Sequence, residues 1–343
     1  MKTPYIFKYI FLDDYSVTPK YLQIVNCILR AIESNKIQKE DILPSINETS
    51  NELEISRDTI EKAYRHLKKL GIINAIRGKG YFISATSFQQ RFKVFLLFNK
   101  LSDYKKLIYD AFAGILGENS IIDFYVYNND FNLFKKILLN VKREYTHYVI
   151  IPQFSEGGER ACDIINSLSE ENVILLERKL DGIKFEHGAV VENFERDIYW
   201  ALEQSNPLIS KYKSIKLLFP ENSYYPKEIK TGFIKFCKDY AFDGKTVSDI
   251  ASEDISEGDL FINIMESDLA VLVEKLISLN LNPGKEVGII SYNETPLKRV
   301  ILNGITTIST DFRKMGELAA GLILENSMKH IEVPFNIHLR PSL

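Results

Sequence analysis

The 343-residue sequence has little cysteine, no long hydrophobic run and almost no net charge. Its three cysteines, Cys27, Cys162 and Cys237, are odd in number and far apart, which excludes a disulfide framework and favours reduced thiols. No apolar run reaches the roughly 18–20 residues that a membrane-spanning helix needs. The opening MKTPYIFKYIFLDDYS interrupts its apolar stretch with charges, unlike a signal peptide. We therefore expect a cytoplasmic protein with no membrane partner.

The sequence also lacks the local motifs of common catalytic sites. It has no Gly-x-Ser-x-Gly elbow, no phosphate loop ending in Gly-Lys-Ser/Thr and no Cys-x-x-Cys pair. Its five histidines never pair at the i,i+4 spacing that places two metal ligands on one helix face. We therefore expect neither an enzyme nor a bound cofactor or metal.

Charge is distributed unevenly along the chain, although the totals of 43 basic and 46 acidic residues nearly cancel. Residues 1–85 hold thirteen Lys and Arg against ten Asp and Glu, and residues 56–81 hold seven against two. A cationic cluster on an otherwise acidic chain indicates either an anionic partner for that segment or a solvated helix face. The periodicity of the same segment distinguishes between these two interpretations.

Apolar periodicity predicts three helices in this segment. The first covers about 19–34, with its apolar residues at helical spacing. The second is short, with Ser45 as its N-cap and Glu48 in the register of a capping box. The third follows the N-cap Ser56 and stops at Gly71, a residue typical of the C′ position. The short turn between the last two predicts a helix-turn-helix, whose second helix enters the DNA major groove.

A β-hairpin is predicted directly after the third helix. Two apolar segments, 72–76 and 81–83, are joined by Arg77-Gly78-Lys79-Gly80. Two glycines and two cations make a loop tip that can approach phosphates or the minor groove. Together the helices and this wing predict a winged-helix DNA-binding domain over residues 1–85, followed by a linker at 86–91.

These motifs resemble the DNA-binding domain of the GntR family of bacterial regulators, from Leu43-Pro44-Ser45 through Ile55-Ser56-Arg57-Asp58-Thr59-Ile60 to Gly78-Lys79-Gly80-Tyr81-Phe82-Ile83. The resemblance implies DNA contacts from Ser45, Ser56, Arg57, Thr59, Arg77, Gly78 and Lys79. We expect Arg57 to read bases, because a guanidinium can bond bidentately to guanine. Ser45 and Lys79 are expected to contact phosphates. Asn47 and Glu61 stand where some family members carry basic residues, so the operator sequence does not follow from the resemblance.

Beyond the linker, short and fully apolar segments alternate with amphipathic stretches. Eight apolar segments lie at 92–98, 121–127, 148–152, 173–176, 189–191, 215–219, 260–265 and 287–292. This alternation is typical of parallel sheets with helices on both faces. Eight or more such units require either a barrel or two doubly wound lobes, and the pattern alone leaves both open.

The C-terminal third resembles the sugar-responsive domain of the LacI family, through residues 287–295, 304–308 and 311–319 and a closing strand predicted at 335–343. The resemblance implies an α/β, periplasmic-binding-protein-like domain over 92–343, with two doubly wound lobes, three crossovers and a ligand in the cleft. It also implies ligand-binding candidates at strand ends: Asn99, Ser102, Tyr104, Arg178, Asn193, Lys227, Glu266, Asp268 and Asn293.

Together the two resemblances imply a homodimeric, sequence-specific transcriptional regulator, with a repressor of a carbohydrate-utilisation operon as the expectation. Its partners would be double-stranded operator DNA and a monosaccharide such as L-arabinose or L-fucose. A nucleobase or phosphorylated sugar as the effector, and activation instead of repression, stay open as alternatives. A phosphate would call for clustered cations, and the candidate cleft residues include only Arg178 and Lys227.

Overall fold

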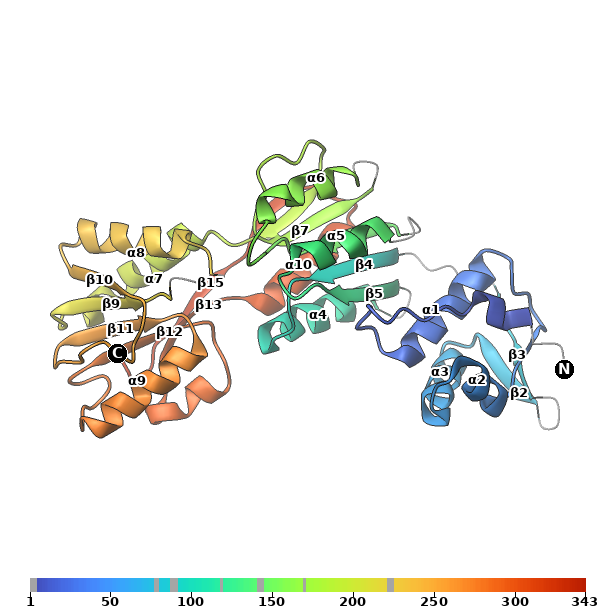
Figure 1. Ribbon diagram of the computed structural model, residues 1–343, viewed down its shortest axis with the longest axis horizontal. Coiled ribbons are helices and arrows are strands. Elements are labelled where there is room, and N and C mark those ends of the chain that lie inside the picture. The colour runs from blue at the N-terminus through green and yellow to red at the C-terminus, as the bar shows by residue number, and fades with distance from the viewer. Residues whose placement is uncertain are drawn as a thin grey trace.

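The computed structural model describes residues 5–76, 80–86, 92–117, 120–140, 145–168, 171–220 and 225–343. They form a winged-helix head and two α/β lobes, with lobe 1 between the head and lobe 2 (Figure 1). The head is residues 5–83, lobe 1 is residues 92–191 and 312–332, and lobe 2 is residues 194–310 and 335–343. None of the described helices combines the length and apolarity needed to cross a bilayer.

The head has the predicted helices and hairpin strands. Its elements are η1 (Tyr5–Tyr9), α1 (Lys20–Glu33), β1 (Ile42–Leu43), α2 (Ile46–Leu53), α3 (Arg57–Lys69), β2 (Ile73–Ile76) and β3 (Gly80–Ile83). The capping box is present, because the Ser45 hydroxyl accepts the Glu48 N–H and the Glu48 carboxylate accepts the Ser45 N–H. Gly71 takes a left-handed φ of 72° just after α3, as a C′ residue does.

Apolar faces of α1 and α3 build the core of the head, and one buried phenol fixes the helix-turn-helix. Ile24, Ile60 and Leu67 have no exposed surface. The Tyr64 hydroxyl donates to the Pro44 carbonyl at 2.8 Å and lies 2.9 Å from the Thr49 hydroxyl. A buried hydroxyl with both partners holds the start of α2 against α3 and so sets the crossing of the two helices.

Lobe 1 is built on a six-stranded parallel sheet in the order β14-β8-β7-β6-β4-β5. Its elements are β4 (Phe92–Phe98), α4 (Asp103–Leu116), β5 (Ser120–Val126), α5 (Phe131–Asn140), β6 (His147–Ile150), η2 (Gly158–Arg160), α6 (Ala161–Asn166), β7 (Val173–Glu177), β8 (Gly188–Val191), α10 (Phe312–Leu324) and β14 (His330–Glu332). Helices α4 and α10 cover one face of the sheet, and α5 and α6 cover the other. Most residues of the inner strands are apolar because both faces of the sheet are buried.

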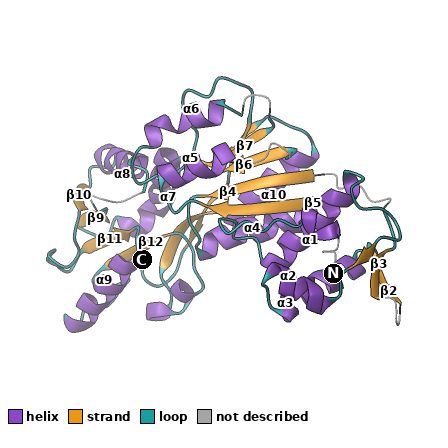
Figure 2. Cartoon of the chain, turned by 45° about the vertical axis from the view of Figure 1, so that its right-hand side comes forward, coloured by secondary structure: helices purple, strands orange, loops and turns teal. Residues whose placement is uncertain are grey.

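Lobe 2 repeats this plan with the strand order β10-β9-β11-β12-β13-β15, in which only β15 is antiparallel. Its elements are α7 (Phe194–Ile209), β9 (Ser214–Leu218), α8 (Glu228–Asp239), β10 (Asp243–Val247), β11 (Asp259–Asn263), α9 (Glu266–Ser278), β12 (Gly288–Tyr292), η3 (Leu297–Arg299), η4 (Ile301–Asn303), β13 (Thr306–Thr310) and β15 (Phe335–His338). Helices α7 and α8 lie on one face and α9 on the other, so helices flank the sheets of both lobes (Figure 2).

The chain passes between the lobes three times, from β8 to α7, from β13 to α10 and from β14 to β15. The predicted α/β class with two doubly wound lobes is therefore confirmed, and the barrel is excluded. All eight predicted apolar segments fall on strands. The carboxyl ends of the strands in each lobe meet the crossovers, which places a cleft between the lobes.

The predicted closing strand at 335–343 is too long, because β15 ends at His338. Pro341 has no N–H for the sheet, and the chain turns so that Ser342 bonds to two strands instead. The Ser342 carbonyl accepts the Ile289 N–H at 2.8 Å, and its hydroxyl accepts the Thr306 N–H at 2.8 Å. Strands β10, β13 and β14 were not predicted, since their sequences are short or polar and give no apolar run.

Candidate DNA-reading surface and inter-lobe cleft

The first turn of α3 is the part of the head that is best placed to meet DNA. The Ser56 hydroxyl caps the helix by accepting the Thr59 N–H at 3.3 Å, and it also lies 2.9 Å from the Thr59 hydroxyl. Ser56 and Arg57 are exposed, and Thr59 is half-buried. Among the described residues, Arg57 has no ion-pair partner and is free to bind an outside group. A helix N-terminus adds a partial positive charge at this point.

The open face of α3 carries the cationic cluster, as the periodicity predicted. Ile60, Ala63, Tyr64 and Leu67 form its buried stripe, and the charged side chains lie outside that stripe. Arg65 pairs with Glu61 at 2.6 Å, and both side chains are more than half exposed. The cluster is therefore a solvated face that also presents positive charge next to the first turn.

The other predicted DNA contacts lie at the start of α2 and in the wing. Ser45 is exposed, and its capping role uses the hydroxyl oxygen as an acceptor, which leaves the hydroxyl proton to donate. Strands β2 and β3 form the antiparallel hairpin of the wing. Arg77, Gly78 and Lys79 lie outside the described residues.

A cavity of about 340 Å³ lies between the lobes, where the first turns of α4 and α9 face the end of β12. It brings together four of the predicted ligand-binding residues: Ser102, Tyr104, Glu266 and Asn293. Its wall also includes Asp103, Tyr225, Ile264, Met265, Ser267, Tyr292, Thr295 and Lys298. Residues of both lobes thus line one space, which the sequence could only place at strand ends.

Three predicted residues lie outside the cavity wall, and two of them, Asn99 and Asn193, bond to other parts of the protein. Asn99 is fully buried and donates to the Asn129 side chain at 2.7 Å. Asn193 caps α7 by accepting the Arg196 N–H at 3.3 Å. Asp268 lies in the first turn of α9 and is half-buried.

The last two predicted residues, Arg178 and Lys227, lie outside the cavity wall as well. Arg178 follows β7 of lobe 1 and pairs with Glu228, the first residue of α8 in lobe 2, at 2.7 Å. Both side chains are more than two-fifths exposed, so this ion pair connects the lobes at the surface. Lys227 is exposed at the N-cap position of α8. Arg178 is therefore placed to respond to the separation of the lobes.

Sequence reasoning missed a polar cluster at the floor of the cleft. Lys105 of α4 and Glu177 at the end of β7 form an ion pair with at most 7% of either side chain exposed. Glu192, just after β8, accepts a hydrogen bond from the Thr310 hydroxyl at the end of β13. Burial and the neighbouring carboxylate of Glu177 raise the pKa of Glu192 to about 8, so this carboxyl holds its proton at neutral pH.

A signal for part of this cluster was present in the sequence. Lys105 lies on the same face of α4 as Ile108 and Phe112, which are buried against the sheet. A lysine within an apolar stripe is rare unless a charged partner is buried with it. The partner Glu177 is 72 residues away in sequence, so only the fold identifies it.

Two buried polar atoms in the cavity wall have no hydrogen-bond partner in the described part of the chain: the Tyr292 hydroxyl and Oδ1 of Asn293. Their residues are 2% and 6% exposed. The Lys298 ammonium, 2% exposed, donates to the Tyr292 carbonyl at 2.9 Å and to the Asn293 carbonyl at 2.8 Å, and so fixes this turn. Burial lowers the pKa of Lys298. Unsatisfied buried polar atoms are costly, and a ligand with hydroxyl groups would satisfy both.

Aromatic rings complete the wall. Tyr104 and Phe312 stack with ring centroids 5.0 Å apart, and Phe194 and Tyr225 line the narrower space of about 40 Å³ behind them. The ionisable residues of the two spaces are nearly balanced, with the carboxyls Asp103, Glu177, Glu192 and Glu266 and the amines Lys100, Lys105 and Lys298. Flat apolar rings beside hydrogen-bonding groups, without excess positive charge, suit a neutral polar ligand. No group of three or more His, Cys, Asp or Glu in the described ranges is arranged to hold a metal ion.

Comparison of sequences places the head among bacterial regulators. Residues 20–83 match the family described as "Bacterial regulatory proteins, gntR family". The HTH-type transcriptional repressor YtrA of Bacillus subtilis is 32% identical over 109 residues, which are 30% of this chain and 80% of that protein. The arabinose metabolism transcriptional repressor of Geobacillus stearothermophilus is 36% identical over 66 residues, 19% of this chain and 18% of that protein.

Comparison of structures identifies the fold of the two lobes. A LacI family regulator, CCPA, from Weissella paramesenteroides with bound sucrose superposes with a TM-score of 0.60 over 73% of this chain and 98% of that chain, at 14% identity. A LacI family regulator from Enterococcus faecium with bound ribose gives 0.58 over the same shares, at 16% identity. At this identity the likeness shows the fold, which confirms the LacI-type, periplasmic-binding-protein-like architecture.

Proposed function

Because the chain belongs to the gntR family of bacterial regulatory proteins, and is thus a transcriptional regulator, we propose that it represses a carbohydrate-utilisation operon. The head binds operator DNA, and a neutral monosaccharide in the inter-lobe cleft releases it. The observation that carries this proposal is the pair of buried, unsatisfied polar atoms on Tyr292 and Asn293. Their two residues line a cavity formed by both lobes, on the same chain as a DNA-reading helix.

On the DNA side, the exposed first turn of α3 supports a base-reading role for Arg57 and backbone contacts by Ser56 and Thr59. Ser45 would contact a phosphate, and the wing residues Arg77, Gly78 and Lys79 would do so beside the minor groove. One head reads only a few base pairs, so a homodimer on a two-fold symmetric operator supplies the specificity that a regulator needs.

On the ligand side, the size and chemistry of the cleft support a monosaccharide. A cavity of about 340 Å³ is near the lower end of ordinary ligand sites, which span roughly 300–1,000 Å³. Tyr104 contributes aromatic surface to the wall for the apolar side of a sugar, while Asn293, Ser102 and Glu266 offer groups for its hydroxyls. The near balance of charge disfavours a phosphorylated sugar. L-Arabinose and L-fucose are the sugars we propose first.

The positions of the crossovers support closure of the lobes as the signal. Glu192 and Thr310 lie at two of the three crossovers and bond to each other, and Arg178 and Glu228 connect the lobes nearby. A ligand held by both lobes binds the closed form more tightly and shifts the population toward it. In a dimer this movement changes the spacing of the two heads.

A thermal-shift screen tests the ligand class, since a ligand of the native state raises the melting temperature. The set contains L-arabinose, L-fucose, ribose, sucrose, the four nucleobases and two sugar phosphates. We expect a neutral sugar to give the largest shift. A shift only with a nucleobase or a sugar phosphate would overturn the choice of effector. Separately, conversion of any of these compounds into a product during incubation with the protein would contradict a non-enzymatic role.

A further inference from the structure

The head contacts lobe 1 directly, through a segment that precedes α1 and covers the edge strand β5. Ser16 forms an antiparallel bridge with Tyr125. The Val17 N–H donates to the Phe124 carbonyl at 2.8 Å, and the Phe124 N–H donates to the Thr18 hydroxyl at 2.8 Å. Strand β5 lies at the end of the lobe 1 sheet, so this strap, residues 10–18, satisfies an edge that would otherwise be open.

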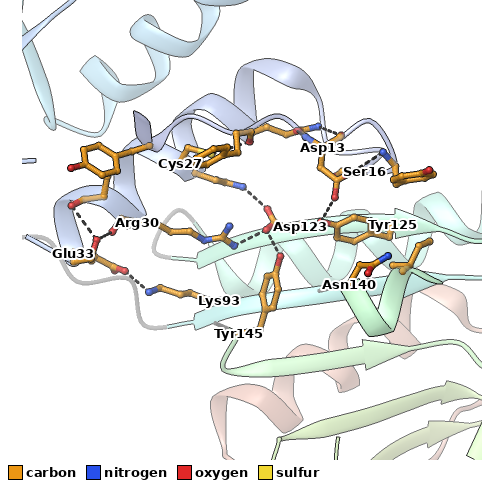
Figure 3. Close-up of a pocket in the computed structure, with 18 of the residues that line it drawn as sticks. Asp13, Ser16, Cys27, Arg30, Glu33, Lys93, Asp123, Tyr125, Asn140 and Tyr145 are labelled. Carbon is orange, nitrogen blue, oxygen red and sulfur yellow. Dashed lines mark hydrogen bonds and ion pairs between the residues drawn. The ribbon is translucent and has the colours of Figure 1, made fainter. Parts of the chain in front are cut away.

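A buried carboxylate lies at the centre of the same contact. Asp123 on β5 accepts hydrogen bonds from Asn26 at 3.0 Å and Arg30 at 2.6 Å, both on α1 of the head, and from Tyr145 of lobe 1 at 2.6 Å (Figure 3). Only 11% of the Asp123 side chain and 23% of the Arg30 side chain are exposed. The guanidinium of Arg30 also lies over the Tyr145 ring, 5.2 Å from its centroid.

Two more polar links and one apolar contact surround this centre. Glu33 of α1 pairs with Lys93 of β4 at 2.6 Å, with 14% and 25% of the side chains exposed. The Tyr125 hydroxyl donates to Asp13 of the strap at 3.0 Å. Ile121 of β5, 1% exposed, belongs to the hydrophobic core of the head. The head and lobe 1 therefore contribute side chains to common ion pairs and to one common hydrophobic core.

The junction is polar and incompletely filled. A cavity of about 600 Å³ lies between the head and lobe 1, with Asp123, Arg30, Glu33 and Lys93 in its wall (Figure 3). Around this cavity the contact is held by its paired charges more than by close apolar packing. The charges nevertheless depend on each other, because removing one partner leaves the other buried without compensation.

We propose that this junction is an interaction surface for the chain's own DNA-binding head, held by Asp123, and that head and lobe 1 move as one body. A movement of lobe 1 then reaches α3 through β5 and α1. This coupling goes beyond the proposed function and does not depend on which ligand the cleft binds.

Small-angle X-ray scattering of full-length variants tests the docking without any ligand. Asp123→Asn keeps the size of the side chain but removes its charge, and we expect it to release the head and increase the radius of gyration. Arg30→Met removes the partner from the head side and leaves lobe 1 unaltered, so it tests the same contact if Asp123→Asn fails to fold. The matched control is Asp163→Asn, which removes an exposed carboxylate from α6 of the same lobe.

The proposal is overturned if both junction variants fold and scatter like the wild type and the control. A second readout tests transmission, with L-arabinose as the probe and operator affinity as the measurement. When two sites are coupled, a ligand at one commonly changes the affinity of the other by about 5–150-fold. We expect L-arabinose to change the operator affinity of the wild type by a factor in this range, and Asp123→Asn to bring that factor toward one. A wild type that ignores L-arabinose counts against that sugar in the proposed function, while the scattering result still decides the docking.

Discussion

Replacing Arg57 by alanine should separate base reading from general attraction to DNA. Arg57 is exposed, and in the described ranges no ion pair holds it, so folding should be unchanged and the whole effect should appear in binding. A bidentate contact to guanine contributes about 1–3 kcal/mol. In the proposed dimer the contact is made twice, and about 2–6 kcal/mol corresponds to a loss of roughly 30-fold to 20,000-fold in operator affinity.

The assay is fluorescence anisotropy on the selected operator and on a scrambled duplex, at two salt concentrations. Affinity for the operator should fall much more than affinity for the scrambled duplex. The matched control is Arg65→Ala, which removes the same side chain from the same helix where it is already paired with Glu61 at 2.6 Å. Equal losses on both duplexes would show that Arg57 contacts only phosphate and would refute the base-reading role.

Three further predictions concern the cleft and the head. Asn293→Gly removes the amide but accepts the φ of 64° at this position; it should weaken sugar binding in calorimetry by roughly 5–150-fold, about 1–3 kcal/mol, and leave operator binding intact. An unchanged sugar affinity would exclude Asn293 from the site. Because the pKa of Glu192 is raised from 4.5 to about 8, the folded protein holds a proton that the unfolded chain has lost, so this group lowers stability as pH rises through that window. The melting temperature of Glu192→Gln should therefore rise relative to that of the wild type as the pH increases from 4.5 to 8. A constant difference between the two melting temperatures would contradict the shift. Tyr64→Phe leaves the buried Pro44 carbonyl and Thr49 hydroxyl without this partner and should cost about 1–3 kcal/mol in denaturant unfolding, against no change for the exposed control Lys62→Gln.

The sequence was sufficient for features that depend on neighbouring residues. Ser45 with Glu48, Ser56 and Gly71 mark helix ends through hydrogen bonds and backbone angles within a few positions, and the structure confirms each of them. Apolar segments likewise located eight strands of the two lobes, because a strand buried on both faces is usually apolar. Strand β13 was missed because it is buried throughout but consists mainly of threonine and serine. The alternation of strands and helices left the barrel open, and only the topology excluded it.

The cleft was predicted in outline because strand ends in parallel sheets meet at one edge. Its buried charges were not predicted, because Lys105, Glu177, Glu192 and Thr310 come together over long sequence separations. Of the adjacent residues Glu177 and Arg178, the sequence favoured the arginine. Glu177 has a φ of 67° and pairs inside the cleft with Lys105, while Arg178 pairs with Glu228 at the surface.

The contact made by the strap near the N-terminal end was likewise not predicted from the sequence. Residues 10–18 carry no alternating or continuous apolar pattern, so the sequence predicted no strand-like pairing for them. Their partner strand begins about a hundred residues later, and the bond between the Ser16 hydroxyl and the Phe124 carbonyl joins positions 108 apart. A contact whose two sides are each unremarkable in sequence becomes visible only in the folded chain.

The reciprocal effect of DNA and sugar tests the central claim most directly, namely that one chain joins an operator-binding head to a sugar-sensing cleft. Isothermal titration calorimetry measures the affinity for the best sugar of the thermal screen, with and without saturating operator duplex. Operator should weaken sugar binding by the same factor by which that sugar weakens operator binding, because linkage between two sites is mutual. A sugar affinity that is the same with and without operator would contradict the account.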